Sequence, residues 1–196
     1  MQSFRQSRQG WICHSVTLLA VTALALLGLT ACQSSPARPT GCPSVQKVAD
    51  ADSLTRFLGE SESTADINFQ ARIYGVYTPR CQVELGGPEA TTGPYVASFQ
   101  VEFVSRARPD DFRFGETTVS YVIVLIRPDG KEVSQAVRQI RMRVTPDKAQ
   151  NSALDTPSIV IPLHSGESAD GYRIDVSLVL TEKERAFNRS HPQPWP

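Results

Sequence analysis

The chain has 196 residues, with 20 basic side chains, 20 acidic side chains and 40% hydrophobic residues. This length and apolar content suit one domain of ordinary size with a substantial core. Balanced charge gives no electrostatic basis for recognising nucleic acid or anionic headgroups, which normally takes a clustered basic surface. We therefore expect no nucleic-acid partner.

Residues 1–31 have the layout of an export signal. Arg5 and Arg8 supply a positive start, and residues 16–29 are apolar apart from two threonines. A membrane-spanning helix needs about 20 apolar residues, so this shorter stretch favours export and removal over a stable span. Removal would leave 18 basic against 20 acidic residues, a net charge near −2.

The signal ends in Leu29-Thr30-Ala31-Cys32. This run resembles, residue for residue, the cleavage site of bacterial lipoproteins, in which cysteine follows Leu, a small residue and Ala or Gly. The resemblance implies a diacylglycerol on the Cys32 sulfur, cleavage before Cys32 and acylation of its new amino group. Gln33, where Asp often marks inner-membrane retention, implies the periplasmic face of the outer membrane. A plain secretory signal cleaved after Ala31 is the alternative.

Two of the four cysteines remain for pairing once Cys13 leaves with the signal and Cys32 takes lipid. In an oxidising compartment, Cys42 and Cys81 are then expected to form a disulfide. A redox pair or a metal site is the alternative. Redox cysteines usually lie close together, as in C-x-x-C, and two cysteines without nearby histidines make a poor zinc site.

Composition divides the exported chain into three parts. Residues 33–40 are polar and contain two prolines, so residues 32–41 are expected to form a lipidated tether. Residues 42–190 should form the folded domain. Residues 191–196 are a Pro-rich tail.

Alternating apolar and polar residues predict several strands. The alternation is clear over 67–74, cleanest over 95–103, and repeated over 158–163 and 172–180. Residues 119–126 are apolar on both faces, which predicts a central strand covered on each side. Pro128-Asp129-Gly130 predicts a turn leading into a partner strand over 131–145. Residues 45–57 suggest a short strand followed by a loop or a turn of helix.

Only one helix is expected, over 182–188, because Thr181 and Glu184 have the spacing of a capping box. About seven strands, turn signals between them and one disulfide favour an all-β fold, an immunoglobulin-like or fibronectin-like β-sandwich with a short C-terminal helix.

Candidate chemical groups are few. His164 and His191 survive signal removal without a partner at metal spacing, and no serine lies in a G-x-S-x-G elbow. Asp110-Asp111 could contribute to a calcium site but is more typical of a solvated turn. We therefore expect no catalytic residue, no metal and no cofactor beyond the lipid on Cys32.

Arginines and aromatic residues are the candidates for docking. Arg138, Arg141 and Arg143 lie on one predicted strand, and Arg106, Arg108 and Arg113 flank the loop with the two aspartates. These arginines suggest either an anion-docking patch or, more simply, charges that keep a sheet soluble and unpaired at its edge. The aromatic candidates for a partner are Tyr74, Tyr77 and Trp195.

The exported part also resembles a group of alphaproteobacterial envelope lipoproteins without an assigned activity. The resemblance rests on Cys42-Pro43, Leu54-Thr55-Arg56-Phe57, Ala71-Arg72-Ile73, Cys81 and Gly87-Pro88. It implies an envelope lipoprotein without an assigned activity. The lipid anchor and the lack of a catalytic motif in the sequence favour a membrane-anchored module that binds or scaffolds another envelope protein without catalysis. A hydrolase acting on envelope lipid or cell-wall polymer is the alternative, and it would need a cleft with a pKa-perturbed acid or histidine.

Overall fold

The computed structural model describes residues 40–59, 63–84, 93–107, 115–144, 150–164 and 166–191. All of them belong to Arg38–Pro196, the second of two compact units into which the chain divides. The strands are β1 (Ser44–Lys47), β2 (Ser53–Phe57), β3 (Ile67–Val83), β4 (Tyr95–Ala107), β5 (Gly115–Ile126), β6 (Glu132–Val144), β7 (Asn151–Asp155), β8 (Ser158–Ile161) and β9 (Arg173–Leu178). The helical segments are η1 (Ala49–Ala51), η2 (Thr64–Asp66) and α2 (Glu182–Ser190).

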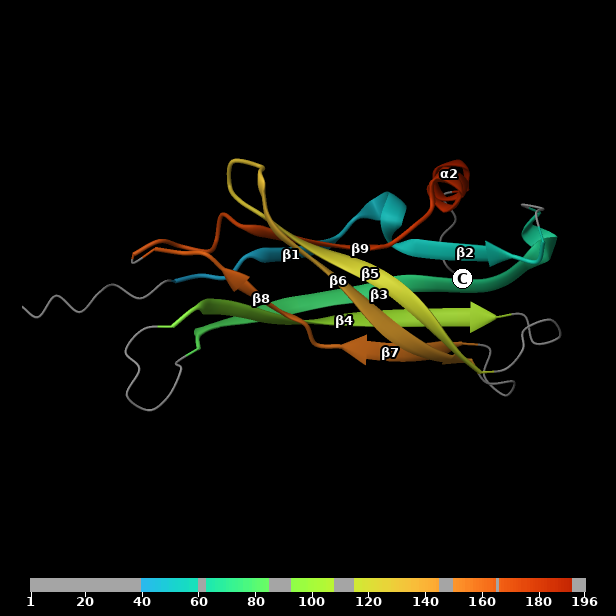
Figure 1. The fold of residues 1–196 in the computed structure, drawn as a ribbon, viewed down its shortest axis with the longest axis horizontal. Helices are drawn as coiled ribbons and strands as arrows, with labels where there is room; N and C mark the ends of the chain where they lie inside the picture. Colours follow the sequence, from blue (N-terminus) through green and yellow to red (C-terminus); the bar gives the residue numbers. More distant parts are fainter. Residues whose placement is uncertain are drawn as a thin grey trace, which may run out of the picture. The chain divides into compact units, whose positions relative to one another are not determined.

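The strands form two sheets. Sheet I has the order β1-β9-β5-β6, and sheet II has the order β2-β3-β4-β7, with β8 also paired to β4. All pairs are antiparallel except β1 with β9, which is parallel. Figure 1 shows β5 and β6 of sheet I crossing over the strands of sheet II. The predicted all-β sandwich with a short C-terminal helix is confirmed.

The core lies between the two sheets, because each strand turns every second side chain inward. Fully buried residues include Phe69, Ala71, Ile73, Phe99, Val101 and Phe103 from sheet II, and Tyr121, Ile123, Leu125, Ile174, Val176 and Leu178 from sheet I. The alternation predicted for the strands near residues 67–73 and 95–103 is thereby confirmed. Each large apolar side chain buried here contributes about 1.5–3 kcal/mol through removal from water.

Three elements differ from expectation. β2 and β7 are strands that periodicity did not predict: the first lies within the expected loop after residue 47, and the second is Asn151–Asp155. β5 is central in sheet I, between β9 and β6, as predicted. Its outward-facing Val122 and Val124 are only half-buried, so the expected cover on both faces is wrong for this part of the chain.

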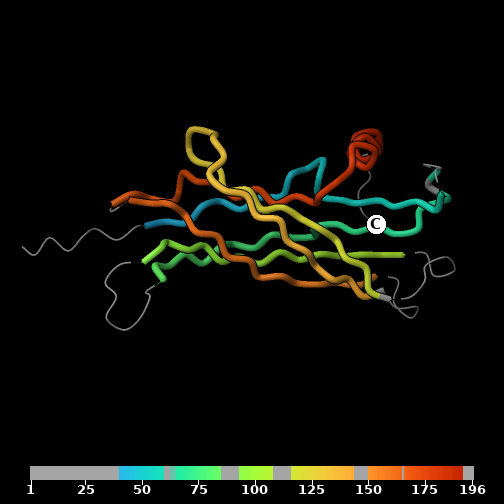
Figure 2. The backbone as a smooth tube through the Cα atoms, viewed as in Figure 1, coloured from blue at the N-terminus to red at the C-terminus, as the bar shows by residue number. Residues whose placement is uncertain are grey.

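Helix α2 begins at the predicted capping box. Thr181 Oγ1 accepts from the backbone N–H of Glu184 at 3.2 Å, and the Glu184 carboxylate accepts from the backbone N–H of Thr181 at 2.7 Å. The helix docks through Phe187, whose ring packs edge-on against Phe57 at 5.0 Å, and through Asn188, which donates to the Ser53 carbonyl at 2.8 Å. Figure 2 shows α2 and the start of β1 toward opposite ends of this unit.

Candidate functional site

The predicted signal, residues 1–31, and the predicted lipid site Cys32 lie outside the described residues. The described chain begins at Thr40, which forms a parallel bridge with Ser168. The Thr40 carbonyl accepts from the backbone N–H of Ala169 at 2.9 Å. Thr40–Cys42, here called the entry segment, is therefore hydrogen-bonded to the loop that precedes β9.

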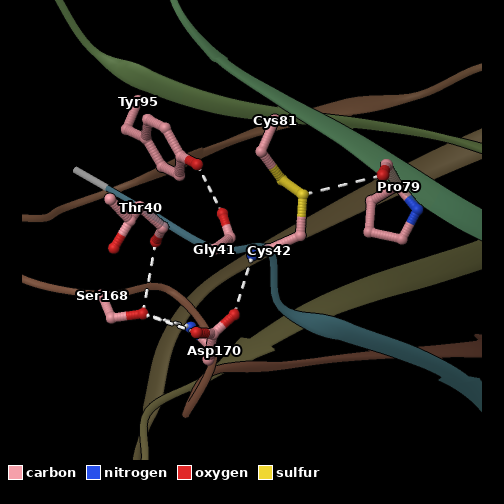
Figure 3. Close-up of a disulfide and its surroundings, with 8 residues drawn as sticks. All are labelled: Thr40, Gly41, Cys42, Pro79, Cys81, Tyr95, Ser168 and Asp170. Atoms are coloured by element: carbon pink, nitrogen blue, oxygen red, sulfur yellow. Dashed lines mark hydrogen bonds between the residues drawn. A yellow bond between two sulfur atoms is a disulfide. The ribbon is translucent and has the colours of Figure 1, made fainter. Parts of the chain in front are cut away.

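A disulfide joins Cys42 to Cys81, with their Cα atoms 5.7 Å apart, which confirms the predicted pair. Cys42 lies two residues before β1 of sheet I, and Cys81 belongs to β3 of sheet II. The bond therefore crosses between the sheets at the point where the chain enters the sandwich (Figure 3).

Further polar contacts surround the disulfide in Figure 3. The Asp170 carboxylate accepts from the backbone N–H of Cys42 at 3.2 Å and from the Ser168 hydroxyl at 2.9 Å. The Tyr95 hydroxyl donates to the Gly41 carbonyl. Gly41 has a φ of +74°, and a Cβ there would lie 2.0 Å from Asp170 Oδ1, so glycine is required at this position.

A second tie between the sheets lies on the side of β6 and β7. The Tyr121 hydroxyl of β5 donates to Asp155 Oδ2 at 2.5 Å, and Arg138 of β6 donates through Nε to the same oxygen at 3.0 Å and through Nη2 to Oδ1 at 3.2 Å. Burial alone would raise the pKa of Asp155, but the bonds from Arg138 and Tyr121 outweigh it and hold that pKa below its usual value. Burial, followed by the bond to Asp155, raises the pKa of Tyr121.

A third polar cluster ties β1 to sheet II. Lys47 Nζ lies 2.9 Å from Asp52 Oδ2, and Arg72 Nη2 lies 3.5 Å from the same oxygen. The Asp52 carbonyl accepts from the backbone N–H of Ile73 at 2.8 Å. The sandwich is therefore braced by polar side chains along both of its long sides, in addition to the disulfide.

The outer face of sheet II carries exposed apolar side chains. Tyr74 is 60% exposed, Tyr77 43%, Leu154 55% and Val160 54%, and we call the surface formed by these four residues the tyrosine face. Glu102 pairs with Leu154 on the neighbouring strand.

Tyr77 is held in place within the tyrosine face. Its hydroxyl donates to the Glu102 carboxylate, and this bond raises the pKa of Tyr77. A Cβ on Gly75 would lie 3.2 Å from the Tyr77 ring, so the absence of a side chain at Gly75 leaves room for that ring. β-Bulges between Ile73 and Gly75 and between Tyr77 and Arg80 interrupt the regular register beside it.

The structure separates the predicted arginine patch. Arg138 points inward to Asp155, whereas Arg141 and Arg143 lie on the outer face of sheet I, where Arg143 Nη2 is 3.6 Å from Glu116. Arg106 of β4 donates to the Gln70 side chain at 2.6 Å. The remaining loop and tail candidates, Arg108, Asp110, Asp111, Arg113 and Trp195, lie outside the described residues.

The two histidines of the described chain have different contacts. His164 is exposed, and its backbone N–H and ring Nδ1 lie 2.9 and 3.4 Å from Glu167 Oε2. The backbone bond from His164 is the main cause that lowers the pKa of Glu167. His191 stacks on the Phe187 ring of α2 at 4.3 Å.

Sequence alternation indicated the outward position of Tyr74 but not the tie around Asp155. The alternation over 67–74 predicts that Tyr74 lies on the outward side of its strand, opposite to Ile67, Phe69 and Ile73, and its exposure agrees. Asp155 lies in the unpredicted β7, so nothing local linked it to Arg138. The available signal was the inward register that Arg138 shares with Met142, since an inward arginine needs a partner.

In the described ranges, no set of three His, Cys, Asp or Glu side chains is placed to hold a metal ion. None of the helices within those ranges has the length and apolar character to cross a membrane. No family model, no curated protein and no solved structure matches this chain.

Proposed function

We propose that the protein is a lipoprotein of the bacterial cell envelope that binds or scaffolds another envelope protein without catalysis. The observation that carries the proposal is the run Leu29-Thr30-Ala31-Cys32 at the end of an export signal. A single acyl chain binds membranes only marginally, whereas two or more anchor stably. A diacylglycerol on Cys32 together with an N-acyl chain would therefore hold the exported chain on a membrane surface.

The tether limits how far the domain can lie from that membrane. From Cys32 to Thr40 the chain has eight Cα-to-Cα steps, which span at most about 28 Å when fully extended. The entry segment is then fixed to sheet I by hydrogen bonds and to sheet II by the disulfide. Such an arrangement would hold the whole sandwich close to the lipid as one body.

The residue after the cysteine supports the compartment that we propose. Gln33 stands where Asp often marks retention in the inner membrane, which favours the periplasmic face of the outer membrane. In that compartment the disulfide would persist, because the periplasm is kept oxidising. The proposed partner is an envelope protein, and the lipid is the only non-protein group that the proposal requires.

In-cell crosslinking with membrane fractionation tests the proposal. The full chain is compared with Cys32→Ala, and Cys13→Ala serves as the matched control because Cys13 lies in the same export signal but outside the cleavage run. We expect the wild type and Cys13→Ala to sediment with membranes and crosslink to one protein partner. Cys32→Ala should lose both properties, and an unchanged Cys32→Ala would contradict the proposal.

A further inference from the structure

From the tyrosine face, we infer that the protein docks a polypeptide segment that carries apolar side chains and a carboxylate. This inference rests on the proposed function, because it names the surface and the partner chemistry of that binding module. Four of the exposed large hydrophobic residues in the described chain lie on this one face: Tyr74, Tyr77, Leu154 and Val160. A sheet face that remains in water normally presents polar side chains.

The tyrosine face is preorganised at its centre. Tyr77 on β3 reaches Glu102 on β4 through its hydroxyl, and Glu102 pairs with Leu154 on β7, the next strand of sheet II. The hydrogen bond from Tyr77 to Glu102 fixes the ring before any partner arrives. Binding therefore loses less side-chain entropy than it would with a freely rotating aromatic residue.

Charge selects the partner. Arg80 is exposed beside the tyrosine face, opposite Ser98 on β4, and forms no ion pair within the described part of the chain. Glu102, the carboxylate on the outer face of these strands, accepts the Tyr77 hydroxyl. A neutral hydroxyl does not cancel the charge of a carboxylate, so the partner's own carboxylate would lie at Arg80 and away from Glu102. The guanidinium of Arg80 is thus available to a carboxylate of the partner.

The outer face of sheet I lacks this combination. Two of its arginines are satisfied locally, because Arg143 lies 3.6 Å from Glu116 and Arg173 lies 2.9 Å from Asp175. Its large exposed hydrophobic side chains are valines, including Val137. Tyrosine and arginine are the residue types enriched at the centres of protein interfaces, which favours sheet II as the docking side.

A polypeptide fits this surface better than a glycan or a lipid. Leu154 and Val160 are aliphatic and more than half exposed, so a partner must bring apolar side chains to cover them. A sugar would stack on the tyrosine rings and leave Leu154 and Val160 exposed to solvent. An anionic lipid headgroup would need several clustered cations, whereas Arg80 is a single unpaired one.

Site-specific photocrosslinking in cells tests the inference on the full chain. A benzophenone amino acid replaces Tyr74 or Leu154 on the tyrosine face, and replaces Val137 on sheet I as the matched control, because Val137 is 63% exposed. Each of the three photocrosslinking variants is also made in combination with Arg80→Glu. Arg141→Glu is the matched control, because it makes the same change of charge on the outer face of sheet I. Mass spectrometry identifies the crosslinked peptide.

We expect protein adducts at Tyr74 and Leu154 but not at Val137, with a crosslinked peptide that contains apolar residues and at least one Asp or Glu. Arg80→Glu should lower the adduct yield by about tenfold, because a like charge replaces an attractive one, while Arg141→Glu should leave it unchanged. Equal adducts on both faces, insensitivity to Arg80→Glu, or adducts with glycan or lipid would each overturn the inference.

Two readouts from the same cells distinguish a failure of this inference from a failure of the proposed function. Membrane sedimentation of the Leu154 variant reports the anchor, and its adduct reports the docking face. A soluble chain that still forms the Arg80-dependent adduct refutes the anchor alone. An anchored chain without that adduct refutes the tyrosine face alone.

Discussion

Removal of the Cys42–Cys81 disulfide should lower the free energy of unfolding of the sandwich, because the unfolded chain then gains conformational entropy. The bond closes a segment of 39 residues. The loop-closure relation gives an entropy of about 13 cal/mol/K for this length, or about 4 kcal/mol at 25 °C. A domain of this size shifts by about 2–4 °C for each kcal/mol, so we expect Tm to fall by about 8–16 °C.

The assay is thermal and urea unfolding of the chain from Gln33 onward, in which Cys42 and Cys81 are the only cysteines. The double variant Cys42→Ala/Cys81→Ala and the reduced wild-type chain should unfold at the same temperature, because both lack only the crosslink. A loss below about 1 kcal/mol would refute the reasoning, because it would mean that the unfolded chain gains little freedom when the bond is removed.

Three further variants probe the polar ties. Asp155→Asn should cost about 1–3 kcal/mol at neutral pH, because Arg138 loses its ionised partner. Since the folded-state pKa of Asp155 is lowered, its contribution is present above the unfolded pKa of about 3.9 and lost as pH falls through the folded pKa. Acid titration of unfolding free energy should therefore be flatter in the variant, and parallel curves would contradict this.

Tyr121→Phe should cost about 1 kcal/mol at neutral pH. Because the pKa of Tyr121 is raised, its contribution is lost as pH rises above about 10, and phenolate absorbance should show one tyrosine ionising only with alkaline unfolding. Gly41→Ala should destabilise more than Gly59→Ala, since both have positive φ but only Gly41 faces a carboxylate within 4 Å. Equal losses of Tm would contradict the close contact.

Local pattern predicted the elements that carry the core. Over 95–103 the order of apolar and polar residues alone indicates which side chains face inward, and the same holds over 67–73 in the strand that contains Phe69. The capping box predicted the start of α2, because Thr181 and Glu184 satisfy backbone groups within one turn. Each of these signals lies within a few neighbouring residues.

Short edge strands could not be predicted in the same way. β7 has five residues, and its most apolar side chain, Leu154, faces solvent while Asp155 faces the neighbouring sheet. This reverses the usual pattern, because Arg138 and Tyr121 supply the partners that make an inward carboxylate stable. Those partners come from the other sheet, so only the pairing of distant strands reveals them.

Strand order is likewise a non-local property. β1 lies beside β9 in parallel, although more than a hundred residues separate Ser44 from its partner Arg173. Periodicity identifies each strand as half-buried, but it carries no information about which strand lies next to it. The disulfide was predictable despite its span, because the predicted export and lipidation leave only two cysteines to pair with each other.

The mass of the N-terminal peptide, measured on protein purified from the cells that make it, tests the central claim most directly. The account predicts a chain that begins at Cys32 and carries a diacylglycerol on sulfur and an acyl group on nitrogen. An unmodified Cys32, or a chain that retains residues 1–31, would contradict it.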